Sequence, residues 1–352
     1  MVTMKIRERL EAKEDLLSPF AKKSRYSNDR ERLEDSSPMR TEFQRDRDRI
    51  IHSKSFRRLK HKTQVFIAPL GDHYVTRLTH TLEVAQIART IARALNLNED
   101  LAEAISLGHD LGHTPFGHVG EDELDKVSPG GFRHAQQSLH IVEHLEKDGS
   151  GLNLTKEVRL GIVNHSKPRG DFLGQFQIDG LSLEAQICRL SDAIAYLNHD
   201  LLDAFRAGVI DMDDIPSEVA QILGGSHSDR VDAMVSDVVS ASWAATGDGA
   251  ESTAPQITMS EEMRDAVYAL REFMFTAVYV PEDLGETGQA ARRIIRMLYC
   301  YVKENRCRIP SELRCGDRAV VDHLSGMTDH YAMRLAESIE PGISRSLTDG
   351  VT

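Results

Sequence analysis

The sequence predicts an all-α fold, with a helical core, additional C-terminal helices and few or no short strands. Apolar residues recur at the three- and four-residue spacing of an α-helix through most of the chain. Capping residues precede several of these segments, and a glycine follows the longest of them. Only residues 63–68 (TQVFIA) and 171–180 (DFLGQFQIDG) resemble strands. Both are short, so we expect at most a small hairpin or an edge piece from them.

The first clearly amphipathic helix lies in residues 80–96 (HTLEVAQIARTIARALN). Val84, Ile87, Ile91 and Leu95 fall at helical intervals there and form one inward stripe. The next helix should begin after Asn98, which is a good N-cap residue and is followed by an acidic first turn.

Two threonine or serine caps mark the central helices. Thr155 is placed to cap a helix over KEVRLGIVNH (156–165). Ser182 is placed to cap a long helix that stops at Gly208. Further helices are expected around residues 228–245, 260–279, 288–304 and 317–338.

At 352 residues the chain can form one large domain or two ordinary ones. We expect a basic N-terminal arm and helix over residues 1–62 and a catalytic core over 63–215. Residues 216–352 should form a helical region that packs on this core.

Charge is unevenly distributed. The net charge is −12, yet residues 21–62 carry 14 Lys and Arg against 7 Asp and Glu, so this segment is +7 and the remainder −19. An acidic protein with one basic segment is not typical of a general nucleic-acid binder, so we do not expect nucleic acid as a substrate. The segment could handle a compact anion, or it could be a solvated arm or a subunit contact.

No apolar run reaches the roughly 18 residues of a membrane span, so no membrane association is expected. The first residues are charged and lack the apolar segment of a secretory signal. The four cysteines form no CxxC pair and no zinc-like spacing. Reduced thiols in a cytoplasmic protein are the expected state.

Two histidines and two aspartates form a candidate metal site. His80 lies four residues before Val84, on the inward stripe of its helix. His109 and Asp110 end the following helix, and Asp192 lies within a long helix that is otherwise apolar on its buried side. A buried carboxylate needs a partner, and one divalent ion satisfies all four groups. The mixed nitrogen and oxygen ligands suit Mn, Mg, Fe, Co, Ni or Zn.

These residues, in the order H…HD…D, resemble the HD-domain phosphohydrolases. The stretches FRRLKHKTQVF, TRLTHTLEV, GHDLGHTPFGHVGE and FRHAQQSLHIV, with the helix around Asp192, resemble more closely the deoxynucleoside triphosphate triphosphohydrolases of the dGTPase-like branch. The resemblance covers most of residues 40–208. It implies that His113, His118, Glu121 and His134 surround the reacting phosphate.

Spacing adds to this resemblance. His118 and Glu121 are three residues apart in an expected helix, so the carboxylate could orient the imidazole as the proton donor. Arg77 shares a helix face with His80, where it would place a cation beside the phosphates.

The resemblance also implies a sugar site. It puts Gln64 and Asp200 at the 3′-hydroxyl and Tyr196 under the ring, where a 2′-hydroxyl would clash. Basic residues of the 21–62 segment, or Arg292, Arg293 and Arg296, could hold the triphosphate tail. His199 and Asp203 have a structural role in this interpretation.

The sequence thus predicts metal-dependent hydrolysis of dNTPs to deoxynucleoside and inorganic triphosphate. The alternatives are another HD-type nucleotide phosphohydrolase (a 5′-nucleotidase or a phosphodiesterase) and a dNTP-binding sensor without turnover. The resemblance further implies a homo-oligomer and an allosteric nucleotide. The preferred base and the role of residues 216–352 do not follow from the sequence.

Overall fold

The fold is entirely helical in the part of the chain that the computed structural model describes: residues 6–27, 29–67, 74–167, 172–173, 178–248, 255–313, 316 and 318–348. The one non-helical pairing among these residues is an isolated antiparallel bridge between Thr63 and Thr76. The all-α prediction is therefore confirmed. Half of the second strand-like segment, residues 171–180, lies outside the described residues, and the other half forms no strand.

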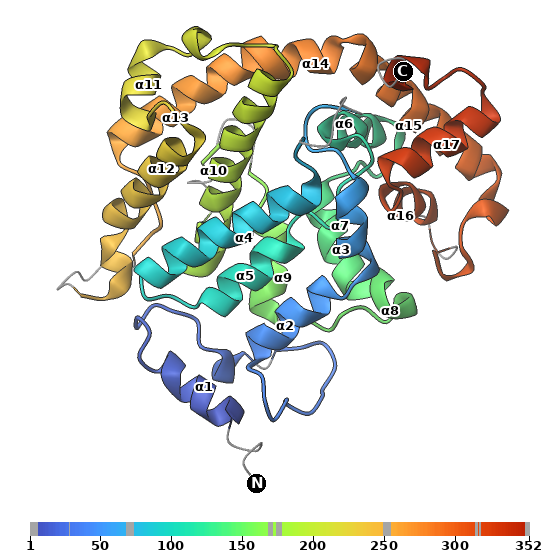
Figure 1. The fold of residues 1–352 in the computed structure, drawn as a ribbon. Helices are drawn as coiled ribbons and strands as arrows, with labels where there is room; N and C mark the ends of the chain where they lie inside the picture. The colour runs from blue at the N-terminus through green and yellow to red at the C-terminus, as the bar shows by residue number, and fades with distance from the viewer. Residues whose placement is uncertain are drawn as a thin grey trace.

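The helices follow one another in four groups (Figure 1). The N-terminal group is α1 (Ile6–Glu14), α2 (Glu42–Ile51) and α3 (Lys54–Arg58). The central group is α4 (Arg77–Ala94), α5 (Glu99–Gly108), α6 (Gly117–Val127), α7 (His134–His140), η4 (Ile141–Leu145), α8 (Glu146–Gly149), α9 (Lys156–Asn164) and α10 (Leu183–Arg206). Next come α11 (Ser217–Leu223), α12 (His227–Ala241), α13 (Glu261–Met274), the π-helical turn η7 (Phe275–Tyr279) and α14 (Val280–Leu284). The last group is α15 (Glu286–Glu304), α16 (Ala319–Ser325), α17 (Asp329–Ile339) and α18 (Arg345–Thr348).

Local sequence explains most helix ends. The side chains of Asn98 and Ser182 accept hydrogen bonds from backbone amides of the first turns of α5 and α10, as predicted. Gly208, just past α10, has a φ of +66°, a conformation that favours glycine. Thr155 differs from the prediction, because its hydroxyl donates to the buried carboxylate of Asp46 (2.7 Å) and makes no cap.

The helix predicted over residues 317–338 is two helices. Helix α16 ends at Ser325, and Gly326 follows it. Thr328 then caps α17, because its hydroxyl accepts a hydrogen bond from the amide of Tyr331. Thr328, an N-cap residue in the middle of a segment with helical spacing of its apolar residues, therefore starts a second helix.

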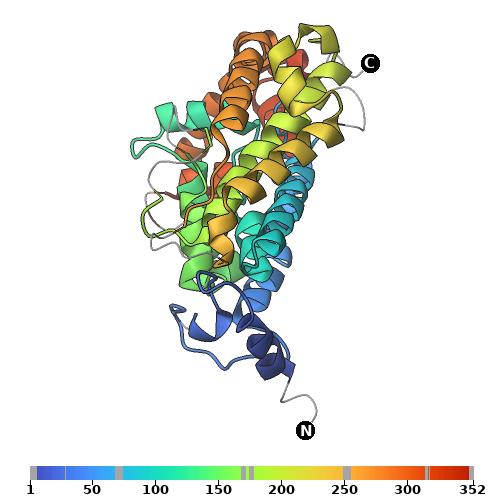
Figure 2. The same ribbon diagram turned by 90° about the vertical axis from the view of Figure 1, so that its left-hand side faces the viewer.

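Two hydrophobic clusters form the interior. The larger one joins α2, α4, α5, α9 and α10 to α11, α12 and α13, and α4 packs against both α5 and α10 (Figures 1 and 2). The smaller one joins α6 to α15, α16 and α17. The predicted division at residues 62 and 215 stays a prediction. Packing in the larger cluster continues past residue 215.

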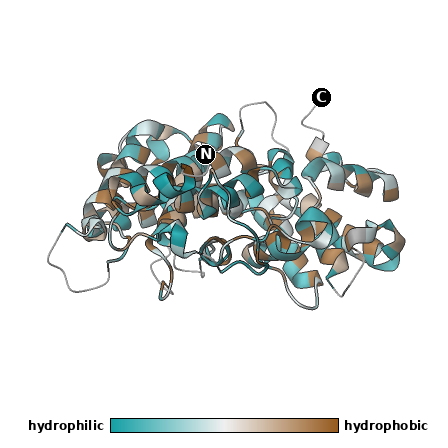
Figure 3. Cartoon of the chain, turned by 90° about the horizontal axis from the view of Figure 1, so that it is seen from below, coloured by the Kyte–Doolittle hydropathy of each residue, from teal (hydrophilic) through white to brown (hydrophobic). Residues whose placement is uncertain are grey.

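Hydrophobic and hydrophilic residues are mixed along the helices (Figure 3). Helices such as α13 and α15 turn an apolar face inward and a polar face outward, as expected for helices that cover a core. Among the described residues, no helix is long and apolar enough to cross a membrane.

Candidate functional site

A cavity of about 640 Å³ lies between α4, α6, α7, α10 and the η7–α14 segment. Nine of the twelve residues predicted for the site line it: Gln64, Arg77, His80, Asp110, His113, His118, His134, Asp192 and Tyr196. Its volume falls in the range of small-molecule sites. Residues far apart in the sequence are thus brought to one place, and the three remaining ones lie just behind its wall.

The four predicted metal ligands lie together. His80 Nε2 is 3.3 Å from Asp192 Oδ1 and 4.0 Å from Asp110 Oδ2. His109 Nε2 is 3.6 Å from Asp110 Oδ1 and 4.0 Å from Asp192 Oδ1. Because α4, α5 and α10 pack on one another, two imidazoles and two carboxylates converge on one point.

The chemistry of these groups fits a divalent cation. His109 Nδ1 lies 2.6 Å from the carbonyl oxygen of Ser106, so it carries the proton and leaves the Nε2 lone pair directed at the cluster. That Nε2 is buried and has no hydrogen-bonding partner among the described residues. Burial lowers the pKa of His80 to about 4, so this imidazole is neutral near pH 7. The ligand atoms of His80, His109 and Asp110 lie within 4.8 Å of one another, and Asp192 lies beside both histidines, so these groups can hold a divalent metal ion through nitrogen and oxygen donors.

Two cations balance the carboxylates of this cluster. Arg77 Nη1 lies 2.6 Å from Asp110 Oδ2, and Lys167 Nζ lies 2.7 Å from Asp192 Oδ2. Burial alone raises the pKa of Asp110, but the neighbouring His109 and Arg77 hold it well below its usual value. Both aspartates are ionised, as metal ligands must be.

Gly112 lets the segment after His109 and Asp110 approach α7 closely. A Cβ at this position would lie 2.2 Å from the amide nitrogen of Ser138 and 2.5 Å from the carbonyl oxygen of His134. The Ser138 hydroxyl accepts from the Gly112 amide (2.8 Å) and donates to the His109 carbonyl (2.7 Å). The absence of a side chain at Gly112 thus allows α7 to bring His134 close to the metal ligands.

A second cluster lies on one side of the metal ligands. It consists of Glu121 and four histidines: His113, His118, His134 and His165. The rings of His113 and His134 stack with centroids 4.4 Å apart. Both nitrogens of the fully buried His113 have no hydrogen-bonding partner in the part of the chain that the structure describes. Unsatisfied buried donors and acceptors are rare in proteins and mark a place where a ligand can bind.

Glu121 holds His134 more closely than His118. Its Oε2 is 2.8 Å from His134 Nδ1 and its Oε1 accepts from the His134 amide (2.9 Å), whereas His118 Nδ1 is 3.4 Å away. This differs from the prediction that Glu121 orients His118. The His118 side chain is 55% exposed and lies beside Tyr196, with ring centroids 6.3 Å apart.

Asp200 lies behind the cavity wall and does not reach it. Its Oδ2 accepts a hydrogen bond from the Tyr279 hydroxyl (2.9 Å), and its Oδ1 is 2.7 Å from His199 Nδ1. The structure thus gives no support to a contact between Asp200 and a sugar hydroxyl. Tyr196, four residues earlier on α10, does line the cavity, and its ring lies 5.5 Å from that of Tyr279.

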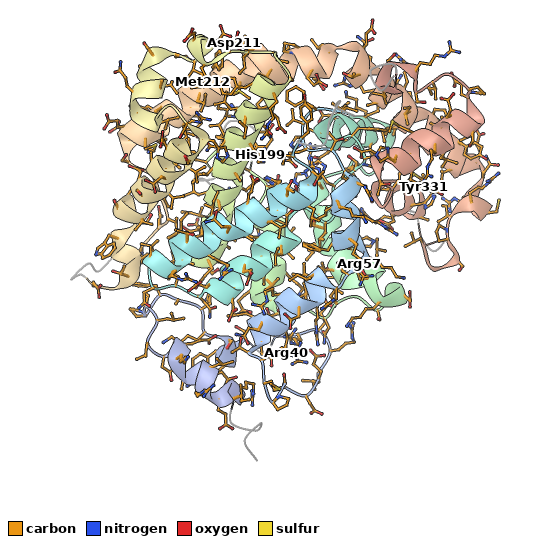
Figure 4. All side chains as sticks on the ribbon, viewed as in Figure 1. Arg40, Arg57, His199, Asp211, Met212 and Tyr331 are labelled. Carbon is orange, nitrogen blue, oxygen red and sulfur yellow. The ribbon has the colours of Figure 1, made fainter. Side chains whose placement is uncertain are left out.

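His199 has a closer relation to the metal site than the sequence suggested. Its Nε2 is 2.8 Å from Nδ1 of His80, and Figure 4 labels it on α10, beside α4. A proton on His80 Nδ1 donated to His199 leaves Nε2 of His80 available as a ligand. His199 therefore orients a predicted metal ligand, while Asp203 accepts from the amide of Val75 (2.9 Å) in a structural contact.

Sequence reasoning missed several cavity-lining residues, among them His165, Lys167, Arg271 and Tyr279. His165 Nε2 lies 3.0 Å from His134 Nε2, and the stretch IVNHS around His165 was a usable signal. Arg271 and Tyr279 come from α13 and the π-helical turn η7, where no motif marks them. π-Helical turns often occur at functional sites.

The basic 21–62 segment does not reach the cavity. None of its described residues lines it. Several of its arginines form ion pairs within and beside the segment, including Arg30 with Glu42 (2.6 Å) and Arg49 with Glu34 (2.7 Å). Arg292 is bound to Asp283, and Arg296 to Glu123 at 2.7 Å. The suggestion that this segment, Arg292 or Arg296 holds the phosphates therefore has no support in the structure.

Comparison with known proteins agrees with this geometry. Residues 77–197 match the HD domain model, and residues 257–338 match the model of the phosphohydrolase-associated domain. A deoxyguanosinetriphosphate triphosphohydrolase-like protein from Caldanaerobacter subterraneus subsp. tengcongensis is 52% identical over 94% of this chain and 94% of its own length. A protein of the same description from Desulfatibacillum aliphaticivorans is 47% identical over 96% of this chain and 98% of its own.

A crystal structure of a hypothetical protein from Aquifex aeolicus aligns more weakly. It is 18% identical, with a TM-score of 0.44 over 87% of this chain and 70% of that chain. The sequence relatives carry the assignment, because they are similar over nearly their whole length. The site geometry and these relatives together show that the chain belongs to the deoxyguanosinetriphosphate triphosphohydrolase-like family of HD-domain phosphohydrolases.

Proposed function

We propose that this protein hydrolyses deoxynucleoside triphosphates to the deoxynucleoside and inorganic triphosphate in a metal-dependent reaction. The names of its relatives support this class of substrate. One observation carries the proposal: a single cavity is lined by the His/Asp cluster, by a second histidine cluster, by cations and by aromatic rings. A deoxynucleoside triphosphate would match all of these groups: its phosphates would contact the metal ion, the histidines and the cations, and its sugar would pack against an aromatic ring.

His80, His109, Asp110 and Asp192 would hold the metal ion. When bound, the ion would supply Lewis-acid polarisation of a phosphoryl oxygen and would promote ionisation of water. Arg77 stays beside Asp110 and adds a fixed cation at the α-phosphate.

Lys167 and Arg271 would hold the triphosphate tail in place of the arginines suggested by the sequence. Both line the cavity, whereas Arg292 and Arg296 do not, and Lys167 also pairs with Asp192 at 2.7 Å. Arg271 lies over the ring of Phe172, 5.1 Å from its centroid, and Lys167 lies 5.7 Å from the same centroid. Two cations near one ring give a polyanion several contacts at once.

His118 would donate the proton to the leaving 5′-oxygen. The leaving oxygen belongs to the sugar, so its proton donor must lie between the phosphate and the sugar. His118 lies between Glu121 and Tyr196, which matches that requirement. His134, held by Glu121, and His113 would contact the reacting phosphate.

Tyr196 and Gln64 would contact the sugar. The Tyr196 ring offers an apolar edge with no partner for a 2′-hydroxyl, which should disfavour ribonucleotides. The side-chain oxygen of Gln64 is buried and has no hydrogen-bonding partner among the described residues, so it is available for the 3′-hydroxyl.

Product analysis in ¹⁸O-labelled water tests the proposal. Each dNTP would be incubated with Mg²⁺ or Mn²⁺, with Asp110→Ala prepared in parallel to exclude a contaminating hydrolase. Attack of water on the α-phosphorus breaks its bond to the 5′-oxygen, so unlabelled deoxynucleoside and triphosphate carrying ¹⁸O are expected. Release of phosphate from nucleoside monophosphates would favour a 5′-nucleotidase, hydrolysis of phosphodiesters would favour a phosphodiesterase, and binding without product would favour a sensor.

Some expectations from the sequence stay predictions. The family resemblance implies a homo-oligomer and an allosteric nucleotide, and the composition and helix pattern predict a cytoplasmic location and the three-part division at residues 62 and 215. Mass determination in solution with and without dNTP measures the first two together.

A further inference from the structure

Helix α17 in the C-terminal region begins with a buried carboxylate that contacts the HD core. Asp329 is 6% exposed. Its Oδ2 accepts a hydrogen bond from the amide of Thr63 (2.8 Å), and its Oδ1 accepts one from the amide of Phe116 (3.1 Å). One side chain therefore joins two core segments that are more than 50 residues apart in the sequence.

Both segments carry residues of the proposed site. Thr63 precedes Gln64, and Phe116 lies between His113 and His118. Neither amide is paired within its own segment, so Asp329 supplies an acceptor that the local structure does not.

The segment around Phe116 needs an external anchor. Phe116 has a φ of +61° and Gly117 a φ of +57°, so two consecutive residues adopt the left-handed conformation. For a bulky residue such as phenylalanine this conformation is costly and persists only where surrounding contacts hold it. A Cβ on Gly117 would lie 3.1 Å from the Gln64 carbonyl oxygen, so the two segments also touch at this point.

Asp329 is not the cap of its own helix. Thr328 has that role. A second contact nearby joins the same parts of the molecule, because the fully buried ammonium of Lys62 donates to the carbonyl oxygens of His113 and Ser325. The start of α17 and the end of α16 thus both contact the segment that carries the catalytic histidines.

We propose that Asp329 is a positioning residue, through which the C-terminal region fixes Gln64 relative to His113 and His118. The inference rests on the proposed function for its effect on catalysis, but the anchoring itself does not depend on the substrate. It also gives residues 319–339 a role in the site that their sequence does not reveal.

The test compares Asp329→Asn and Asp329→Ala with a matched control, Asp322→Asn. Asp322 is also a buried carboxylate of the C-terminal region (5% exposed), but it contacts Gln137 and His140 of α7. Hydrogen–deuterium exchange of peptides covering residues 59–67 and 109–120 reports the anchoring without any substrate. Turnover of dNTPs, metal content and melting temperature are measured on the same preparations.

We expect faster exchange in both peptides of the Asp329 variants and not in the control. kcat should fall by roughly 10- to 100-fold while metal content is retained, because misplacing catalytic groups by about 1 Å has effects of this size. Asn keeps one acceptor oxygen, so Asp329→Asn should lose less than Asp329→Ala. Asp322→Asn should keep kcat within about threefold at a comparable loss of melting temperature.

Three results would overturn the proposal: unchanged exchange in both Asp329 variants, wild-type kcat despite faster exchange, or an equal fall of kcat in Asp322→Asn at the same melting temperature. If the wild-type protein itself turns over no dNTP while the exchange results hold, the proposed function fails and the anchoring by Asp329 stands.

Discussion

Replacing His199 with glutamine should weaken metal binding although His199 is not a metal ligand. In the structure His199 Nε2 lies 2.8 Å from Nδ1 of His80, which holds the ring orientation of that ligand and leaves its Nε2 directed at the cluster when Nδ1 carries the proton. Glutamine has similar polarity but cannot reach both His80 and Asp200 with the same geometry. The variant leaves the buried Nδ1 of His80 without a well-placed partner.

The expected loss of metal affinity follows from the removal of this single contact between His199 and His80. Removing an outer partner of a metal-ligating histidine typically reduces metal affinity by about 10- to 100-fold, or about 1.4–2.7 kcal/mol. At a metal concentration of about 100 times the wild-type Kd, binding stabilises the wild-type protein by about 2.7 kcal/mol. A 30-fold weaker Kd leaves about 0.9 kcal/mol of this, so about 1.8 kcal/mol of metal-dependent stabilisation should disappear.

Chelator competition with Mn²⁺ measures the affinity directly, and denaturant unfolding with and without Mn²⁺ measures the stabilisation. The matched control is His140→Gln, because His140 also contacts a carboxylate (Asp322 Oδ2, 3.3 Å) but lies away from the metal ligands. A His199→Gln protein with Mn²⁺ affinity within twofold of wild type would refute this reasoning. An equal loss in His140→Gln would show that the effect comes from general destabilisation.

Three other predictions concern the reaction. Tyr196→Ala should lower dNTP turnover and narrow the ratio of dNTP to NTP in kcat/KM, whereas equal hydrolysis of ATP and dATP by the wild-type protein would contradict the role of Tyr196. Lys167→Met and Arg271→Met should each raise KM for dNTPs by about tenfold with a smaller effect on kcat, as steady-state kinetics can show, because each removes a proposed contact to the triphosphate tail. Glu121→Ala should lower kcat at least as much as His118→Ala, by about 10²–10⁴-fold with metal retained. The reason is that Glu121 also holds His134 through two contacts. A clearly smaller loss of kcat in Glu121→Ala would instead favour a role of Glu121 that is limited to orienting His118.

Much of the fold and the placement of the metal ligands could be predicted because both depend on short-range sequence patterns. Asn98 and Ser182 cap their helices through backbone amides only three residues away. The position of His80 on the inward face of α4 follows from its four-residue spacing to Val84. His109 and Asp110 are adjacent, so one helix end places both.

Choices between competing partners could not be predicted in the same way. Glu121 lies three residues from His118, yet its shortest contacts are with His134, which is brought close by the packing of α7. The basic segment suggested an anion site, but its arginines meet acids from other positions, such as Asp100 and Glu103 with Arg47. A charge count records how many cations a segment has and not which of them are already paired.

The arrangement of the site also explains why the C-terminal region could not be assigned from its own sequence. The metal ligands lie on α4 and α10 and at the end of α5, helices of the larger hydrophobic cluster, which among the described residues includes none from α15–α17. His113 and His118, which would act on the phosphate, lie on either side of Phe116 in the sequence. Phe116 belongs to the smaller hydrophobic cluster, together with residues of α15–α17. Catalysis needs both sets within a few ångströms of one phosphate, so it depends on how firmly the two clusters are joined. The contacts of Asp329 and Lys62 lie at that junction; Lys62 belongs to the stretch FRRLKHKTQVF, whereas Asp329 belongs to none of the motifs that marked the site.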